Sequence, residues 1–199
     1  MNAIILAGGL SRRMHGFPKA FLRLGGQTFL ERILAVVSPL VDTVLIVTNE
    51  PERCAGVDAR VVPDEREGGG PLMGIYSGLK ACGVEASFVT AADTPLLSRA
   101  LVERLVNSWN DCDVRVPRWR GYFEPLCAVY ARRCLHSIEE TMDRHPAGAA
   151  APRIIDFFPL VRVCPLEEAE VRSLDPEGLS FLNINTDADY RRIRPIFPA

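Results

Sequence analysis

The sequence predicts an α/β fold, with one doubly wound, mostly parallel sheet and helices on both of its faces. Short apolar runs alternate with amphipathic stretches of helical periodicity through the first 110 of its 199 residues. The run at residues 4–6 is apolar at every position, which is typical of a strand buried on both faces. We therefore expect right-handed crossovers, with ligands bound beyond the carboxyl ends of the strands.

The first half contains four apolar runs that we interpret as strands, at residues 4–6, 41–48, 60–63 and 87–92. Gly25 and Gly26 predict a tight turn between short extended pieces. A helix is expected after Thr28 and Glu31, whose spacing is that of a capping box. A further helix is expected after the glycine cluster at residues 68–74, through Leu79 and Cys82, and another over residues 98–109.

The second half is less regular. Strands are expected at residues 113–117 and 125–130, and a helix at 137–145. Residues 154–163 fit either an edge strand or a short helix. A last helix is expected after residue 186, capped by Thr186 or Asp187.

Composition and charge narrow the class of protein. The chain is 48% hydrophobic and 24% charged, as in ordinary globular proteins, and is long enough for one good core. With a net charge of -2 and a pI near 6.0, no overall basic field would attract nucleic acid. No apolar run is long enough to span a membrane, and the N-terminus lacks a signal-peptide pattern, so we expect a cytoplasmic protein.

The six cysteines show no C-x-x-C pair and no histidine at metal-ligand spacing. Several lie within apolar stretches, where a free cysteine behaves as a small hydrophobic residue. We therefore expect buried structural thiols, not zinc ligands or disulfides.

The most informative stretch is residues 4–19, which read IILAGGLSRRMHGFPK. Ala7, Gly8 and Gly9 remove side-chain bulk directly after a strand, so the backbone can approach a ligand closely. The cations Arg12, Arg13 and Lys19 follow; small residues with clustered cations suit a polyphosphate. The stretch is neither a Walker A loop nor a dinucleotide fingerprint. The alternative is a glycine turn with solvated basic residues.

Polar side chains follow several of the expected strands. Asn49, Asp64 and Asp93 each lie at a strand end, as does Leu6, so they should meet at one edge of the sheet. Asp93 begins an Asp-x-Pro sequence, and a single carboxylate with phosphate oxygens is a common way to hold Mg²⁺. The alternative for Asp93 is a turn or helix cap.

These motifs together resemble the molybdenum cofactor guanylyltransferases. The first loop of that family, L-A-G-G-x-S-x-R-M-G-x-x-K, is matched at Leu6, Ala7, Gly8, Gly9, Ser11, Arg13, Met14 and Lys19. His15 and Pro18 depart from the family pattern. Later matches are Gly70, Pro71, Leu72 and Gly74, then Pro125, Leu126, Ala128 and Tyr130, and finally Asn183, Asn185, Thr186 and Asp189. Asp187 and Ala188 replace the family's usual Pro-Glu.

The resemblance implies a Rossmann-like nucleotidyltransferase domain over residues 1–199, with a nucleotide-binding half (1–110) and an acceptor-binding half (111–199). Its reaction would be GMP transfer from GTP to the phosphate of molybdopterin, with release of pyrophosphate. Cofactor-delivery or acceptor molybdoenzyme proteins would be further partners.

Roles carry over to matching positions only. The resemblance implies GTP binding by Leu6, Ala7, Gly8, Gly9, Lys19, Asn49, Asp64 and Asp93, with Mg²⁺ on Asp93. Arg13 and Lys19 would offset charge on the leaving pyrophosphate. Asp64 would accept from N1–H and the 2-amino group of guanine. Asn183 and Asn185 would orient the metal or the acceptor, and contacts to the pterin are considered for Arg118, Trp119, Arg120 and Arg153.

Two other functions remain open. A cytidylyl- or sugar-nucleotidyltransferase of the same fold would not need Asp64 to bind guanine, so turnover of GTP against CTP separates them. A non-catalytic carrier of the molybdenum cofactor would need no stabilisation of a leaving group. The presence of Arg13, Lys19 and Asp93 together argues against a carrier.

Overall fold

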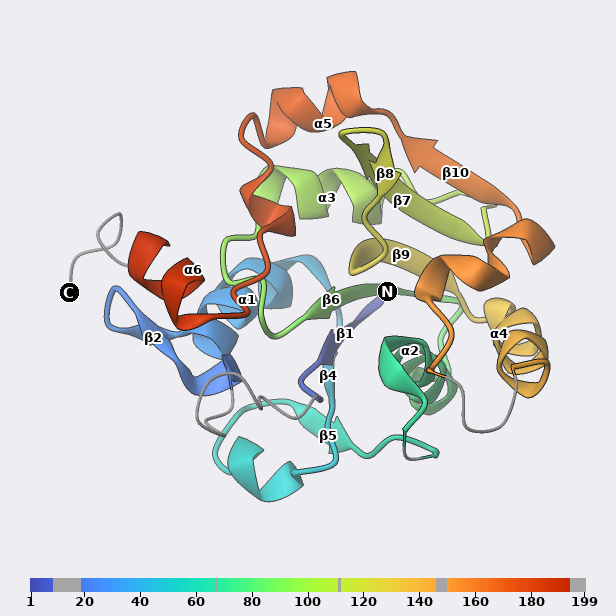
Figure 1. Ribbon diagram of the computed structural model, residues 1–199, viewed down its shortest axis with the longest axis horizontal. Helices are drawn as coiled ribbons and strands as arrows, with labels where there is room; N and C mark the ends of the chain where they lie inside the picture. The colour runs from blue at the N-terminus through green and yellow to red at the C-terminus, as the bar shows by residue number, and fades with distance from the viewer. Residues whose placement is uncertain (9–18, 67, 111, 146–149, 194–199) are drawn as a thin grey trace.

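The computed structural model describes residues 1–8, 19–66, 68–110, 112–145 and 150–193. Its centre is an eight-stranded sheet in the order β10-β7-β9-β6-β1-β4-β5, with β8 paired to β7 (Figure 1). The strands are β1 (Asn2–Leu6), β4 (Val44–Val47), β5 (Arg60–Val62), β6 (Ala86–Ala91), β7 (Val114–Trp119), β8 (Tyr122–Phe123), β9 (Cys127–Ala131) and β10 (Val163–Leu166).

Most of the sheet is parallel. β1 pairs in parallel with β4 and β6, β4 with β5, and β10 with β7. β9 runs antiparallel to both β6 and β7, and β8 forms a hairpin with β7. The doubly wound, mostly parallel sheet predicted from the sequence is therefore confirmed.

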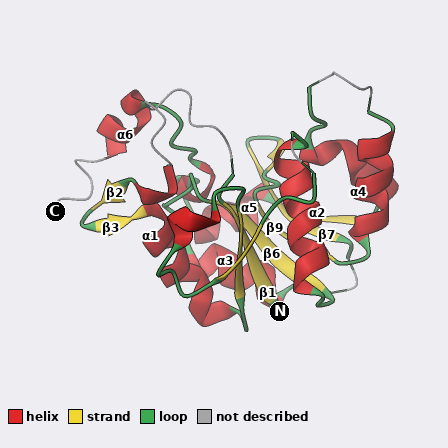
Figure 2. Ribbon diagram, turned by 90° about the horizontal axis from the view of Figure 1, so that it is seen from below, coloured by secondary structure: helices red, strands yellow, loops and turns green. Residues whose placement is uncertain are grey.

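Helices cover both faces of the sheet. Figure 2 shows α1 (Phe29–Val37) and α3 (Arg99–Asn107) on one side, and α2 (Gly70–Cys82) and α4 (Cys134–Asp143) on the other. α5 (Glu168–Leu174) joins the first layer, whereas the 3₁₀ helix η4 (Ile154–Leu160) joins the second. α6 (Asp187–Ile193) lies near the small hairpin of β2 (Arg23–Leu24) and β3 (Gln27–Thr28) (Figure 1).

The short strand β1 shows why its apolar residues are needed at every position. Ala3 and Ile5 contribute to the core beneath α1 and α3, whereas Ile4 and Leu6 contribute to the core beneath α2. Because successive side chains point to opposite faces, a central strand covered on both sides buries all of them. The sequence pattern of residues 4–6 thus predicted its place in the sheet correctly.

Local signals at the start of α1 are also confirmed. Gly25 and Gly26 have φ values of 61° and 80° in the turn between β2 and β3. The hydroxyl of Thr28 accepts a hydrogen bond from the Glu31 amide (3.1 Å), and the Glu31 carboxylate accepts one from the Thr28 amide (2.6 Å). This capping box satisfies two amides at the helix end that have no partner within the helix.

Two glycines of α2 face β1, so the helix packs directly against side chains of the strand. A Cβ atom at Gly78 would lie 2.6 Å from Ile4 Cγ2, and one at Gly74 would lie 3.1 Å from Leu6 Cδ2. Real Cβ contacts at the first distance essentially do not occur, so a side chain at Gly78 would push the helix away from the sheet.

Several element boundaries differ modestly from the expectation. The strand expected over 41–48 is confined to Val44–Val47. Within residues 154–163, Ile154–Leu160 form the helix η4, and β10 begins at Val163 and ends at Leu166. The expectation of an edge strand or a short helix there is resolved as a helix followed by an edge strand. Within the described part of the chain, no helix has the length and apolar character needed to cross a membrane.

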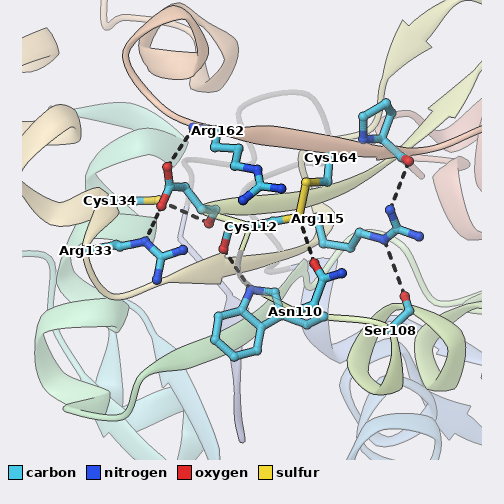
Figure 3. The surroundings of a disulfide bond; sticks show 11 residues. Ser108, Asn110, Cys112, Arg115, Arg133, Cys134, Arg162 and Cys164 are labelled. Carbon is cyan, nitrogen blue, oxygen red and sulfur yellow. Dashed lines mark hydrogen bonds and ion pairs between the residues drawn. A yellow bond between two sulfur atoms is a disulfide. The ribbon is translucent and has the colours of Figure 1, made fainter.

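The expectation that no disulfide forms is wrong. Cys112 and Cys164 are bonded, with 6.0 Å between their Cα atoms (Figure 3). They are 52 residues apart, and only the pairing of β10 with β7 brings them together, so the spacing of cysteines could not reveal the bond. Cys54, Cys127 and Cys134 are buried free thiols, as expected.

Asp113, next to Cys112 in the sequence, contacts Arg133, Cys134 and Arg162, which Figure 3 labels around the disulfide. Its carboxylate accepts from the Arg162 amide (2.6 Å) and forms an ion pair with Arg133, and its backbone carbonyl accepts from Cys134 Sγ (3.3 Å). Burial of Asp113 would raise its pKa, but the hydrogen bond from the Arg162 amide and the guanidinium of Arg133 outweigh this effect and lower the pKa. The bond therefore lies in a corner that is fixed by other contacts as well.

Candidate functional site

The carboxyl ends of β1, β4, β5 and β6 form a continuous edge. Backbone hydrogen bonds extend the strands by one residue there: Ala7 N–H to Val47 O, Ala92 N–H to Leu6 O, and Thr48 N–H to Val62 O, each 2.9 Å. These bonds fix the chain just before the polar residues begin. Leu6, Asn49, Asp64 and Asp93 consequently lie on one edge, as the strand ends predicted.

Lys19 joins two segments that are far apart in the sequence. Its Nζ lies 3.4 Å from Asp93 Oδ2 and also donates a hydrogen bond to Asn185 Oδ1. The Lys19 and Asp93 side chains are only 21% and 25% exposed. The Ile184 amide donates to the Asp93 carbonyl (2.9 Å), so backbone and side-chain bonds together hold Asn185 beside the carboxylate.

Asp93 retains an unused acceptor. Its Oδ1 atom is buried and has no hydrogen-bond partner among the described residues. A buried carboxylate oxygen without a partner is costly unless a ligand or ion satisfies it. The Lys19–Asp93–Asn185 cluster is therefore incomplete in the way expected of a binding site.

Asn49 and Asp64 form a second polar pair, beyond β4 and β5. The Asn49 side chain donates to Asp64 Oδ2 (3.0 Å) and accepts from the Asp64 amide (2.9 Å). Burial raises the pKa of Asp64, and the hydrogen bond from Asn49 opposes that rise. Asp64 Oδ1 is also buried, with no partner in the described part of the chain.

Gly74 leaves the space beside Asp64 open. A Cβ atom at this position would lie 3.6 Å from Asp64 Oδ1 and 3.1 Å from Leu6 Cδ2. The glycine that matched the Gly70–Gly74 motif therefore packs α2 against both β1 and the carboxylate. Its role follows from close packing of the helix on this edge.

The segment after Asn183 is held rigidly by Asp189. One carboxylate oxygen of Asp189 accepts from the Asn185 amide (3.0 Å), the Thr186 amide (2.8 Å) and the Thr186 hydroxyl (2.9 Å), while the Asp189 amide donates to that hydroxyl (3.1 Å). The hydrogen bond from the Thr186 hydroxyl is the main cause of the lowered pKa of Asp189. Thr186 thus caps α6, as expected, and fixes the position of Asn185.

Of the remaining residues predicted for the site, some lie at the end of β1, some lie outside the described residues, and one does not join the cluster. Leu6 is buried, and Ala7 and Gly8 follow it at the end of β1. Gly9 and Arg13 lie outside the described residues. Asn183 is exposed, and no contact in the described part of the structure joins it to Lys19 or Asp93.

The residues considered for the pterin have other contacts in the structure. Trp119 is buried against Phe181, with 5.8 Å between ring centroids, and a Cβ atom at Gly178 would lie 2.4 Å from its ring. Arg153 binds Asp156 (2.8 Å). Trp119 therefore serves the core between β7 and the segment that leads to Asn183.

One residue of this edge was missed in the sequence. Glu124 precedes Pro125 at the start of the segment leading into β9, and burial raises the pKa of its carboxyl group to about 7. The available signal was a charged residue directly before the Pro125–Tyr130 motif. The antiparallel direction of β9, which brings Glu124 to the carboxyl edge of β6, was not evident from the sequence.

The fold and this edge define a class. A mostly parallel α/β sheet carries a paired lysine and aspartate at the end of a central strand, and a second polar pair at the end of a neighbouring strand, which is the arrangement of nucleotidyltransferases. The family model described as MobA-like NTP transferase domain matches residues 3–156. The chain belongs to this family.

Relatives extend the similarity over nearly the whole chain. It is 37% identical to the molybdenum cofactor guanylyltransferase of Desulfosudis oleivorans, covering 96% of this chain and 93% of the relative. It is 38% identical to a probable molybdenum cofactor guanylyltransferase of Methanosarcina acetivorans, covering 94% and 87%.

Solved structures agree with the fold. The molybdopterin-guanine dinucleotide biosynthesis protein A of Archaeoglobus fulgidus superposes with a TM-score of 0.81 at 26% identity, over 98% of each chain. The 2-C-methyl-D-erythritol 4-phosphate cytidylyltransferase of Thermus thermophilus gives a TM-score of 0.71 at 17% identity, covering 98% of this chain and 97% of that one. The second similarity concerns the fold alone.

Proposed function

We propose that this protein transfers GMP from GTP to the phosphate of molybdopterin and releases pyrophosphate. The observation that carries the proposal is the Lys19–Asp93–Asn185 cluster at the carboxyl edge, in a chain 37% identical to a molybdenum cofactor guanylyltransferase. A cation held by a carboxylate at a strand end suits phosphoryl chemistry, because both reactants are anionic.

In the proposed reaction, a phosphate oxygen of molybdopterin attacks the α-phosphorus of GTP. The new P–O–P bond forms as the bond from the α-phosphorus to the bridging oxygen of pyrophosphate breaks. Negative charge therefore grows on the leaving group, and the Lys19 ammonium is available to offset it. Arg13 has the same proposed role on the basis of the family motif.

Asp64 is the residue that we propose recognises the guanine base. Its carboxylate has one oxygen without a partner, and Asn49 fixes the other. Guanine presents two adjacent donors, N1–H and the 2-amino group, which a carboxylate can accept together. Adenine lacks this donor pair, so a fixed carboxylate favours GTP over ATP.

The residues at Asp93 fit a magnesium ion. Asp93 offers a buried oxygen without a partner, and Asn185 offers an amide oxygen beside it. In the part of the chain that the structure describes, no three His, Cys, Asp or Glu side chains form a metal-binding group. Mg²⁺ commonly uses one or two protein ligands, with phosphate oxygens and water completing its shell. When bound, it would neutralise charge on the triphosphate.

The cellular location and the protein partners are part of the same proposal. A protein that uses GTP and passes on a nucleotide-bearing cofactor would act in the cytoplasm. Acceptor molybdoenzymes, or proteins that deliver the cofactor to them, would be its protein partners. A cytidylyl- or sugar-nucleotidyltransferase of this fold is the second candidate, and a non-catalytic carrier of the cofactor is the third.

Pyrophosphate release tests these candidates directly. The purified protein is supplied with Mg²⁺, molybdopterin and each of GTP, ATP, CTP and UTP in separate reactions. Release with GTP alone supports the proposal, whereas release with CTP transfers the assignment to a cytidylyltransferase. Tight binding of molybdopterin without release from any nucleotide would favour the carrier. Omission of molybdopterin is the control for simple hydrolysis of the nucleotide.

A further inference from the structure

Glu124 lies at the carboxyl edge, one strand away from Asp93. β9 is antiparallel to β6, and their last pair at this edge is Thr90 with Cys127. From this pair, one chain continues for three residues to Asp93, and the other leads back three residues to Glu124. The sheet order β7-β9-β6 therefore places Glu124 between the ends of β7 and β6.

Backbone contacts fix Glu124, whereas its carboxylate is left without a partner. The Glu124 amide donates to the Pro117 carbonyl (3.0 Å), and its carbonyl accepts from the Cys127 amide (3.1 Å). The side chain is half-buried, and no described residue forms a hydrogen bond or ion pair with it. A fixed, half-buried carboxylate without a counterion is uncommon unless a ligand supplies its donors.

The arm formed by residues 181–185 crosses the same strand ends. Phe181 packs on Trp119 at the end of β7, and the Ile184 amide binds the Asp93 carbonyl after β6 (2.9 Å). The start of β9 lies between these two attachment points. Glu124 is thus located where the arm that carries Asn185 passes over the sheet.

Electrostatic effects identify the face on which the carboxylate lies. Burial raises the pKa of the Cys127 thiol, and the charges of Glu124 and Asp175 raise it further, so both carboxylates lie near it. Cys127 belongs to the core shared with Trp119 and Val171 of α5. Glu124 is therefore on the face that the arm and α5 cover.

We propose that Glu124 binds the pterin ring of the acceptor, by accepting hydrogen bonds from its N3–H and 2-amino group. This inference rests on the proposed function and identifies a residue that would determine acceptor specificity. Pterin and guanine share a 2-amino-4-oxopyrimidine ring, so the donor pair that suits Asp64 on the nucleotide also suits a second carboxylate on the acceptor.

The two ends of the acceptor require opposite partners. Its phosphate is anionic and belongs near the Lys19 ammonium, because a carboxylate would repel it. Its pterin end is neutral and presents two donors side by side, which two carboxylate oxygens can accept together. A carboxylate without a cation therefore suits the pterin end.

Binding of simple pteridines tests this inference without turnover. Pterin (2-amino-4-oxopteridine) and lumazine, which carries an oxygen in place of the 2-amino group, are titrated by fluorescence quenching at pH 7.5, where most of each ligand retains its N3–H. We compare the wild-type protein with Glu124→Gln and with Glu85→Gln, in which the exposed Glu85 directly precedes β6 at the opposite, amino end of the strand. Gln is similar in size to Glu, so the fold should be retained. Its side-chain amide offers one acceptor oxygen, whereas the carboxylate offers two.

We expect Glu124→Gln to bind pterin about 10- to 100-fold more weakly, the range for a lost hydrogen-bonded charge, and to lose the preference for pterin over lumazine. The KM for molybdopterin should rise while the KM for GTP stays unchanged, and Glu85→Gln should match the wild type. Unchanged pterin affinity in Glu124→Gln would overturn the inference, as would an equal loss of affinity for both pteridines. If wild-type protein binds pterin but releases no pyrophosphate from GTP, the proposed function fails while the binding role of Glu124 is still measured.

Discussion

Lys19 and Asp93 form an ion pair at the carboxyl edge of the sheet, with 3.4 Å between Nζ and Oδ2. Both side chains are mostly buried, and Asn185 accepts a further hydrogen bond from the same ammonium. Because the Lys19 ammonium is already held in place, it can interact with an anionic substrate with little rearrangement of the protein. The pair therefore links Asp93, which follows β6, with Lys19, the first residue of the 3₁₀ helix η1 (Lys19–Phe21).

Lys19→Ala should reduce kcat/KM for GTP by about 100-fold or more, in the range seen when a single charge-stabilising group is removed. Its thermal unfolding should remain cooperative. Arg104→Ala is the matched control, because it removes an exposed ion pair with Glu170 away from this edge, and such pairs contribute at most about 1 kcal/mol. Equal activity losses in the two variants would contradict a specific role for Lys19.

Asp93→Asn keeps the size of the side chain but removes its charge. Turnover should fall by about 100-fold or more, and added Mg²⁺ should not restore it, because a neutral amide in place of the carboxylate binds Mg²⁺ more weakly. The measurement is pyrophosphate release over a range of Mg²⁺ concentrations. Asp42→Asn, at an exposed carboxylate that pairs with the N-terminus, is the control. Wild-type activity and metal dependence in Asp93→Asn would remove Asp93 from the site.

Asp64→Asn should reduce the preference for GTP over ATP by about 100-fold, because one of the two acceptors for guanine becomes a donor. Competition between labelled GTP and each unlabelled nucleotide measures the effect. A variant that loses affinity for GTP and ATP equally would instead indicate a structural role for Asp64.

The raised pKa of Asp64 adds a pH dependence with a definite sign. The folded protein holds this proton to higher pH than the unfolded chain, so ionisation of Asp64 lowers stability as pH rises from about 3.9 through the folded pKa. Asp64→Asn should therefore show less loss of stability across this window in urea titrations. An identical pH dependence in the two proteins would contradict burial as the cause.

Much of the nucleotide half could be predicted because its signals are local. The capping box of Thr28 and Glu31, the glycine turn and the fully apolar strand at 4–6 depend on neighbours in sequence. The strand ends at Asn49, Asp64 and Asp93 followed from the parallel topology. Such patterns determine an element and its face without knowledge of distant contacts.

The acceptor half was predicted less well because its contacts connect distant segments. Asn185 meets Lys19 across 166 residues, and Cys112 meets Cys164 across 52. Glu124 reaches the edge only because β9 reverses direction between β6 and β7. None of these pairings has a local signature, so they emerge only when the sheet order is known.

The disulfide should stabilise the protein without supporting its activity directly. Cys112 precedes β7, which runs parallel to β6, so the bond lies near the amino ends of the strands, opposite the site. Closing a loop of 52 residues in the unfolded chain contributes about 4 kcal/mol in the chain-entropy account. The double variant Cys112→Ser/Cys164→Ser should lose up to this amount in urea unfolding, with nearly normal turnover at 25 °C.

Dithiothreitol should lower the stability of the wild type and leave the double variant unchanged. Cys82→Ser, at a partly exposed free thiol, is the control and should respond to reductant like the wild type. An insensitive wild type would show that this bond does not contribute to stability.

Gly178, three residues before the arm of residues 181–185, is required both by its backbone conformation and by the side chain packed against it. Its φ is +67°, and an added Cβ atom would lie 2.4 Å from the Trp119 ring. Gly83 has nearly the same φ, +68°, but nothing within 4 Å of its added Cβ atom. Comparing an alanine substitution at Gly83 with one at Gly178 therefore distinguishes the cost of backbone strain from that of steric overlap.

Gly83→Ala should cost about 1 kcal/mol, the price of the left-handed conformation alone. Gly178→Ala should cost about 1–3 kcal/mol more, because Trp119 or the arm must move. Displacement of the arm would also disturb Asn185 beside Lys19, so turnover should fall in Gly178→Ala and not in Gly83→Ala. Urea unfolding and pyrophosphate release measure the two effects separately. Equal stability losses in the two variants would show that the Trp119 contact can relax freely, and the arm would then not be held by this packing.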